Sequence, residues 1–192
     1  MPFYHEQVPT TVRVAQAVGI TASAFLCGQM AGSSYQLVPS IMQAPAPLLA
    51  RQFKKSFEMG ITTVPGLMFS SLVCAWLATR EPISSSAFKL YTAAAVLLPS
   101  CIPYTLLVMK PIQDKLCARA DSLTALEDEA AEAGIAQEDT VHGMVDKWAT
   151  LNLGRTVING VAALCVAWAT ISKVDVVGFE RVGLATGADR LG

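Results

Sequence analysis

Four side chains able to bind a ligand recur at helical spacing between residues 148 and 170, in a stretch that is otherwise apolar enough to cross a bilayer. They are Trp148, Asn152, Arg155 and Asn159. Because they follow one another at intervals of four, three and four residues, they share one face of a helix. An arginine held in hydrocarbon costs about 2.5–3.5 kcal/mol, so such residues usually face a bundle interior, a partner or a ligand. This polar face predicts the wall of a site; the alternative is a structural arginine that reaches the interface or ties helices together.

One further pair could transfer protons. His142 and Asp146 stand four residues apart at the start of the same predicted helix, so their side chains can meet. No other pair in the sequence is a credible proton-transfer element. The alternative is that His142 is an ordinary residue at the membrane surface.

Two other positions could border a cavity. Gln29 lies near the far end of the first apolar stretch, and Pro99 and Pro103 stand one helical turn apart beside Tyr104 and Thr105. A proline removes a backbone donor, so the carbonyls that lose their partners must be satisfied by neighbouring groups. The paired prolines therefore indicate either a cavity edge or a simple bend for helix packing.

The composition excludes an ordinary soluble domain, because 53% of the residues are apolar, 15% are charged and the mean hydropathy is +0.45. The net charge of −1 and the lack of a Lys/Arg-rich run leave no nucleic-acid footprint. The two histidines are far apart and lack companions at metal-ligand spacing, so we expect no metal centre. The five cysteines form no CxxC pair, which favours neither a disulfide framework nor a thiol redox motif. The expected surroundings are lipid.

The elements that must hold these residues are four transmembrane helices. Apolar stretches of spanning length cover roughly residues 14–35, 57–79, 87–109 and 148–171. They predict an all-α fold, an integral membrane four-helix bundle forming one transmembrane domain over residues 1–192. Leucines near helical spacing add a short amphipathic helix outside the membrane, over residues 113–133 between the third and fourth spans.

Prolines and charges predict where these helices bend or end. Pro39 should stop the first helix, and Pro65 with Gly66 should kink the second. The basic stretch from Arg51 to Lys55 should lie at the membrane surface, where its cations meet lipid headgroups.

Three segments carry a family resemblance: LLARQFKKSFEMG before the second span, PYTLLVMKPIQDKL at the end of the third and WATLNLGR at the start of the fourth. They resemble the fungal anthrone oxygenase family, small membrane proteins of aromatic polyketide pathways. The most specific elements are W-x-x-x-N-x-x-R and the P-Y-T and M-x-P run, and the resemblance covers roughly residues 14–169. The sequence departs from the family pattern at Gln113, where relatives often carry Asn, and at Phe53 and Phe57, where they often carry another aromatic.

The resemblance implies a monooxygenase that oxidises an anthrone to an anthraquinone with dioxygen and no bound cofactor, in polyketide secondary metabolism. An anthrone enolate can pass an electron to dioxygen unaided, so the protein needs only a base, a partner for the enolate oxygen and a dry apolar slot. Arg155 with Asn152 can supply the oxyanion partner, and His142 is the candidate base. The expected substrate-binding residues are Trp148, Tyr104, Thr105, Asn159, Phe57 and Gln29.

A non-enzymatic interpretation stays open beside this one. A small four-helix membrane protein could carry hydrophobic metabolites or serve as a scaffold for pathway enzymes, and the polar face would form a ligand site in either case. A quinone or thiol oxidoreductase is less supported, because the cysteines lack pairing. We expect a flat aromatic polyketide as substrate, lipid but no nucleic acid as partner, and an endomembrane location in the endoplasmic reticulum or vesicles. Association with a second copy or with pathway enzymes is compatible with the sequence.

Overall fold

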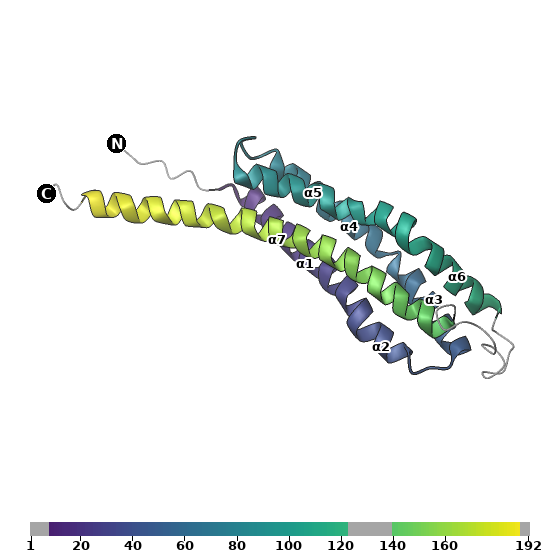
Figure 1. Cartoon of the computed structure of the whole chain (residues 1–192). Helices are drawn as coiled ribbons and strands as arrows, with labels where there is room; N and C mark the ends of the chain where they lie inside the picture. Colours follow the sequence, from purple (N-terminus) through teal and green to yellow (C-terminus); the bar gives the residue numbers. More distant parts are fainter. Residues whose placement is uncertain (1–7, 123–139, 189–192) are drawn as a thin grey trace.

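The computed structural model describes residues 8–122 and 140–188, with side chains described up to residue 172. Over these residues the chain is all-α, and its helical segments form rods that run side by side (Figure 1). The segments are α1 (Thr10–Gly32), the π-helix η1 (Ser33–Leu37), α2 (Val38–Ile41), α3 (Ala46–Gly60), α4 (Thr63–Ala78), α5 (Ser86–Tyr104), the π-helix η2 (Thr105–Met109), α6 (Lys110–Ser122) and α7 (Val141–Ala188).

Four rods in the described part of the chain are long and apolar enough to cross a membrane. They run over Thr10–Ile41, Ala46–Ala78, Ser86–Ser122 and Val141–Ser172, so they contain nearly all of the predicted spans and extend beyond them. The prediction of an all-α chain with four such helices is confirmed. Large apolar side chains cover the outside of the bundle as well, with Leu107 78% and Leu164 71% exposed. An apolar exterior of this kind fits a membrane protein.

Two clusters of buried apolar side chains hold the rods together. The first lies between α1, α4, α5 and α7 and includes Leu26, Leu67 and Leu98. The second lies at the end of the bundle where α2, α3 and α6 meet the start of α7, and it includes Phe53 and Leu116. These inward side chains recur every three or four residues, as one face of a packed helix requires.

The second rod differs from the prediction at its start. The basic stretch belongs to α3, which packs against α6 and buries Leu49, Ala50 and Phe53 in the second cluster, while Lys54 forms an ion pair of 2.6 Å with Asp121. The sequence predicted only a position at the membrane surface for this stretch, whereas its helix is also part of the bundle. The kink predicted at Pro65 and Gly66 is present as a turn between α3 and α4, at Ile61 and Thr62.

Pro65 explains the position of this turn. A proline ring clashes with the carbonyl four residues before it, and that carbonyl belongs to Ile61. The helix is therefore interrupted one turn before the proline and not at the proline itself.

Pro39 does not end the first rod, contrary to the prediction. The helix widens into η1 before the proline and continues to Ile41. The Val38 N–H bonds to the Ser33 carbonyl five residues back, and the third rod repeats the arrangement, with the Lys110 N–H bonded to the Thr105 carbonyl before Pro111. A widened turn leaves room for the proline ring, so each helix continues where an α-helix would break.

The predicted separate helix over residues 113–133 is not confirmed. Residues 113–122 belong to α6, which continues the third rod directly from η2. Leu116 is fully buried in the second cluster, so this segment is part of the bundle. Residues 123–139 lie outside the described residues.

Pro99 lies inside α5 and leaves the Ala95 carbonyl without its usual backbone donor. The Ser71 hydroxyl of α4 donates to this carbonyl at 2.7 Å. A side chain of the neighbouring helix thus supplies the donor that the proline lacks, and α5 continues through the proline without a break.

We expect Ser71→Ala to lower the free energy of unfolding by about 0.6–1.7 kcal/mol, the range for interhelical hydrogen bonds in membrane proteins. Ser70→Ala is the matched control. The Ser70 hydroxyl is buried and has no hydrogen-bond partner in the described part of the chain, so its removal should leave stability unchanged or increase it. Reversible unfolding in mixed micelles measures both, and equal losses would contradict the role given to Ser71.

Candidate functional site

A cavity of about 210 Å³ lies where the two buried clusters meet. It exceeds the ~150 Å³ cavity that holds benzene in an engineered protein. All four rods contribute to its walls, including both π-helices and the end of α3. Most of the wall is apolar, and its polar and aromatic residues and its one cysteine are Gln29, Ser33, Phe53, Ser56, Phe57, Thr63, Cys101, Thr105, Gln113, Trp148, Asn152 and Arg155.

Arg155 carries the charge in this wall. The Cys101 thiol lies 3.9 Å from the Arg155 carbonyl oxygen, which places the arginine at the level of Cys101 in the third rod. Within residues 8–122 and 140–172, its guanidinium forms no ion pair, and its Nε has no hydrogen-bond acceptor. A cation in such a position has its charge available for a ligand.

Two more donors belong to side chains that line the cavity. Gln113 of α6 is 2% exposed and Trp148 of α7 is 7% exposed. The Gln113 Nε2 and the Trp148 Nε1 are both enclosed, and neither has an acceptor among the residues described. The Phe53 ring contacts the Trp148 ring edge to face, with centroids 5.1 Å apart and planes at 84°. The cavity is therefore rich in hydrogen-bond donors that lack partners.

Asn152 has a different environment, although it lines the same cavity. Its Nδ2 donates to the Met30 carbonyl at 2.8 Å and to the Ser34 hydroxyl at 3.0 Å, both in the first rod. The Ser34 hydroxyl in turn donates to the Ala149 carbonyl at 3.0 Å. Since both amide hydrogens of Asn152 are used in this way, the side chain ties α7 to the first rod and has no donor left for a ligand.

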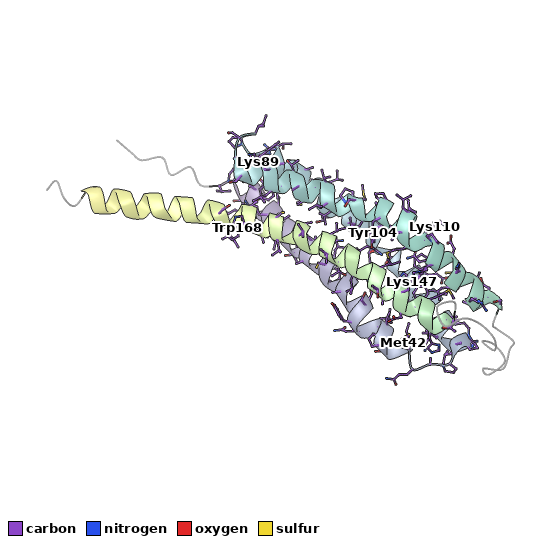
Figure 2. All side chains as sticks on the ribbon, in the orientation of Figure 1. Met42, Lys89, Tyr104, Lys110, Lys147 and Trp168 are labelled. Atoms are coloured by element: carbon purple, nitrogen blue, oxygen red, sulfur yellow. The ribbon has the colours of Figure 1, made fainter. Side chains whose placement is uncertain are left out.

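Tyr104 and Asn159 lie beside the cavity but do not line it. The Tyr104 hydroxyl donates to the Leu151 carbonyl at 2.9 Å, and Figure 2 shows Tyr104 between the third rod and α7. The Asn159 Nδ2 contacts the Cys101 Sγ at 2.9 Å and the Met30 Sδ at 3.1 Å. Both side chains connect helices behind the cavity wall.

His142 lies in the first turn of α7, where its Nε2 is 3.1 Å from the Ala44 carbonyl oxygen. It does not line the cavity. Thirteen residues separate it from Arg155, which is about 20 Å along a helix. The structure therefore does not bring the candidate base to the candidate oxyanion partner.

Six of the nine residues proposed from the sequence line one cavity, and three do not. Those that line it are Gln29, Phe57, Thr105, Trp148, Asn152 and Arg155. Sequence reasoning gave no role to Gln113, Phe53 or Cys101. Gln113 precedes Leu116 by three residues and Ala120 by seven, so this spacing could have placed it on the buried face of its helix.

The charge of the cavity lining and the residues at its opening indicate what kind of ligand the cavity suits. Of its described lining residues, none is Asp, Glu, His or Lys, so Arg155 is unopposed there. Ile61 and Leu106, each 55% exposed, stand at the rim of the cavity, so apolar side chains flank its opening. This arrangement suits a flat apolar ligand with an oxygen that bears, or develops, negative charge.

Comparisons with known proteins identify the family. The family model described as anthrone oxygenase matches residues 53–165. The chain is 26% identical over 130 residues to the anthrone oxygenase ptaC of Pestalotiopsis fici, which covers 66% of this chain and 89% of that relative. No solved structure matches significantly. Gln113, Trp148 and Arg155 all lie within the matched residues, which make up more than half of the sequence. The chain therefore belongs to the anthrone oxygenase family, as the sequence resemblance indicated.

Proposed function

We propose that this protein oxidises an anthrone to an anthraquinone with dioxygen, within the cavity around Arg155. The observation that carries the proposal is an unopposed guanidinium in the wall of a largely apolar cavity, in a chain of the anthrone oxygenase family. The substrate class follows from the family and from the cavity, whose aromatic and aliphatic walls suit a flat polycycle.

The reaction balances without another reactant. Loss of one C10 proton gives an enolate, which transfers one electron to dioxygen to form a carbon radical and superoxide. These combine to a C10 peroxide anion, which takes up a proton to become the hydroperoxide. The hydroperoxide then loses the second C10 proton and hydroxide as water and leaves a carbonyl at C10. One dioxygen is consumed and one water is released, and the oxygen that stays on the ring comes from dioxygen.

Arg155 would stabilise the enolate oxygen. The segment between Lys89 and Lys110 of the third rod carries no charge and is about 30 Å long, close to the hydrocarbon thickness of a bilayer. Figure 2 shows Lys89 near the start of that rod and Lys110 well along it, before α6 completes the rod. Arg155 lies at the level of Cys101, about 13 Å from Lys110 along the helix. A cation so far from bulk water interacts strongly with a developing anion, because the apolar surroundings screen it little.

We further propose that the chemistry needs no bound cofactor. An enolate that becomes aromatic on ionisation is electron-rich enough to reduce dioxygen directly, and both reactants concentrate in lipid. Among the described residues, no group of three His, Cys, Asp or Glu side chains could hold a metal ion. The apolar rim at Ile61 and Leu106 would let a substrate enter sideways from an endomembrane bilayer.

The described cavity wall offers no ordinary base, since it contains no carboxylate, imidazole or amine. We assign proton removal to water or hydroxide inside the cavity, because Arg155 makes the bound anthrone more acidic. The enolate fraction then rises with pH through the neutral range. A histidine base would instead give a rate that levels off above a pKa near 6.5.

The test is dioxygen uptake by purified, metal-stripped protein in lipid nanodiscs supplied with anthrone. We expect catalysis well above the spontaneous rate, one dioxygen consumed per anthraquinone, and oxygen from labelled dioxygen in the product. His142→Gln should keep both the parent rate and a rate that rises with pH. Binding of anthrone without turnover would overturn the proposal in favour of a carrier, and activity that returns only with added metal or flavin would refute cofactor independence.

A further inference from the structure

We infer that Gln113 and Trp148 determine substrate specificity by binding a neutral oxygen substituent on an outer ring of the polycycle. The inference rests on the proposed function, which places the enolate oxygen at Arg155. It concerns the opposite end of the same cavity, where two enclosed donors have no acceptor among the residues that the structure describes.

The two donors belong to one end of the cavity. The second buried cluster joins α6 to the start of α7 through Leu116, Val145 and Trp148, and Gln113 stands one turn before Leu116. Trp148 lies two helical turns before Arg155 on the same face of α7, which is about 10 Å. The oxygen on the central ring of an anthrone and an oxygen on its outer ring are roughly 6 Å apart, and a hydrogen bond of about 2.9 Å at each makes up the rest of that separation. A polycycle that contacts Arg155 through its central ring can therefore present an outer ring to Gln113 and Trp148.

Each enclosed donor favours an acceptor. A buried donor without a partner is unfavourable, and a ligand oxygen that accepts from it would remove this cost. The Phe53 ring packs edge-on against Trp148, so the indole cannot easily turn away to find another partner. Gln113 is almost fully buried, so solvent does not satisfy its amide.

The uncharged donors also indicate the chemistry of the substituent. At this end the described cavity wall contains no cation, because its one arginine stands two turns away. A carboxylate here would lose its hydration without gaining a counter-charge, which is unfavourable. A neutral acceptor such as a hydroxyl, carbonyl or ether oxygen would gain hydrogen bonds without this cost.

The experiment compares anthrone with 3-hydroxyanthrone, which adds one oxygen on an outer ring. For the parent we expect a higher kcat/KM with the hydroxylated compound. Gln113→Leu should lower kcat/KM for 3-hydroxyanthrone about five- to a hundredfold more than kcat/KM for anthrone, mostly through KM. Trp148→Phe keeps an aromatic ring but removes the donor, and it should also lower kcat/KM for 3-hydroxyanthrone more than kcat/KM for anthrone.

Gln52→Leu is the matched control. The Gln52 Oε1 is also enclosed without a partner in the described part of the chain, but this residue does not line the cavity. The variant should change neither substrate's kcat/KM. Equal losses for both substrates in Gln113→Leu, or none, would overturn the inference while leaving the proposed function intact.

A binding experiment separates the two proposals. Equilibrium binding of anthraquinone and 2-hydroxyanthraquinone to the nanodisc protein requires no turnover. If the parent binds the hydroxylated quinone more tightly and Gln113→Leu and Trp148→Phe remove the preference, the inference holds even for a protein that fails to oxidise anthrone. No preference in the parent would refute it, whatever the enzyme activity, and Trp148→Phe supplies the answer if Gln113→Leu fails to fold.

Discussion

Arg155→Lys is expected to lower kcat for anthrone oxidation by about a hundred- to a thousandfold, the usual effect of losing one preorganised oxyanion donor. Lysine keeps the positive charge but not the planar fork of donors, and its flexible chain can move the ammonium toward the membrane interface. The Arg155 guanidinium forms no ion pair in the described part of the chain, so the change removes no internal salt bridge. Stopped-flow absorbance of the quinone product measures the effect.

Arg80→Lys is the matched control, because it makes the same substitution away from the cavity. Arg80 stacks over the Trp76 ring at 4.6 Å, and neither residue lines the cavity. We expect turnover within about twofold of the parent, since the lost stacking is worth only ~0.5–1 kcal/mol of stability at an exposed site. If Arg155→Lys lost activity only in proportion to lost folded protein, Arg155 would be a structural residue and the oxyanion partner would lie elsewhere.

Gly154→Ala should destabilise the protein more than an added methyl group at Gly19, Gly66 or Gly160, where the nearest atom to the new Cβ is at least 3.4 Å away. A Cβ there would lie 2.5 Å from the Tyr104 hydroxyl oxygen and 3.0 Å from its Cζ. The tyrosine would have to move, and its 2.9 Å hydrogen bond to the Leu151 carbonyl would be lost. Overpacking of this kind costs about 1–3 kcal/mol, partly offset by the better helix propensity of alanine. Reversible unfolding in micelles measures the loss.

Gly28→Ala is the control for helix propensity, because nothing lies within 4 Å of the added Cβ. It should stabilise the protein by up to about 1 kcal/mol. Tyr104→Phe removes the clashing oxygen, so adding it to Gly154→Ala should cost less than the sum of the two single changes. Additive losses would show that the hydroxyl is not what opposes a side chain at position 154.

The fold could be predicted from the sequence where it depends on a local pattern of residues. It could not be predicted where it depends on contacts with another helix or on a local change of helix type. Four apolar runs of spanning length are enough to predict four long helices. The outcome at each proline depends on its surroundings: Pro99 is accommodated because Ser71 of another helix supplies a donor, and Pro39 because the helix widens before it. Neither compensation can be read from the residues next to the proline.

The same distinction applies to the site. Helical spacing alone placed Trp148, Asn152 and Arg155 on one face, and all three line the cavity. Spacing could not reveal that the donors of Asn152 are already used by the first rod, 118 and 122 residues away in sequence. It also suggested His142, because a histidine beside an aspartate is a local pattern, whereas distance from the cavity is a property of the folded chain.

The π-helix η2 determines in which direction around the helix axis each later side chain of the third rod points. A π turn contains one residue more than an α turn, and one residue corresponds to about 100° around the helix axis. With an unbroken α-helix from Ser86 onward, Gln113 would therefore point about 100° away from its present direction, out of the wall that it shares with Trp148. The extra residue before Pro111 therefore determines which side chains of α6 face the substrate and which face the lipid.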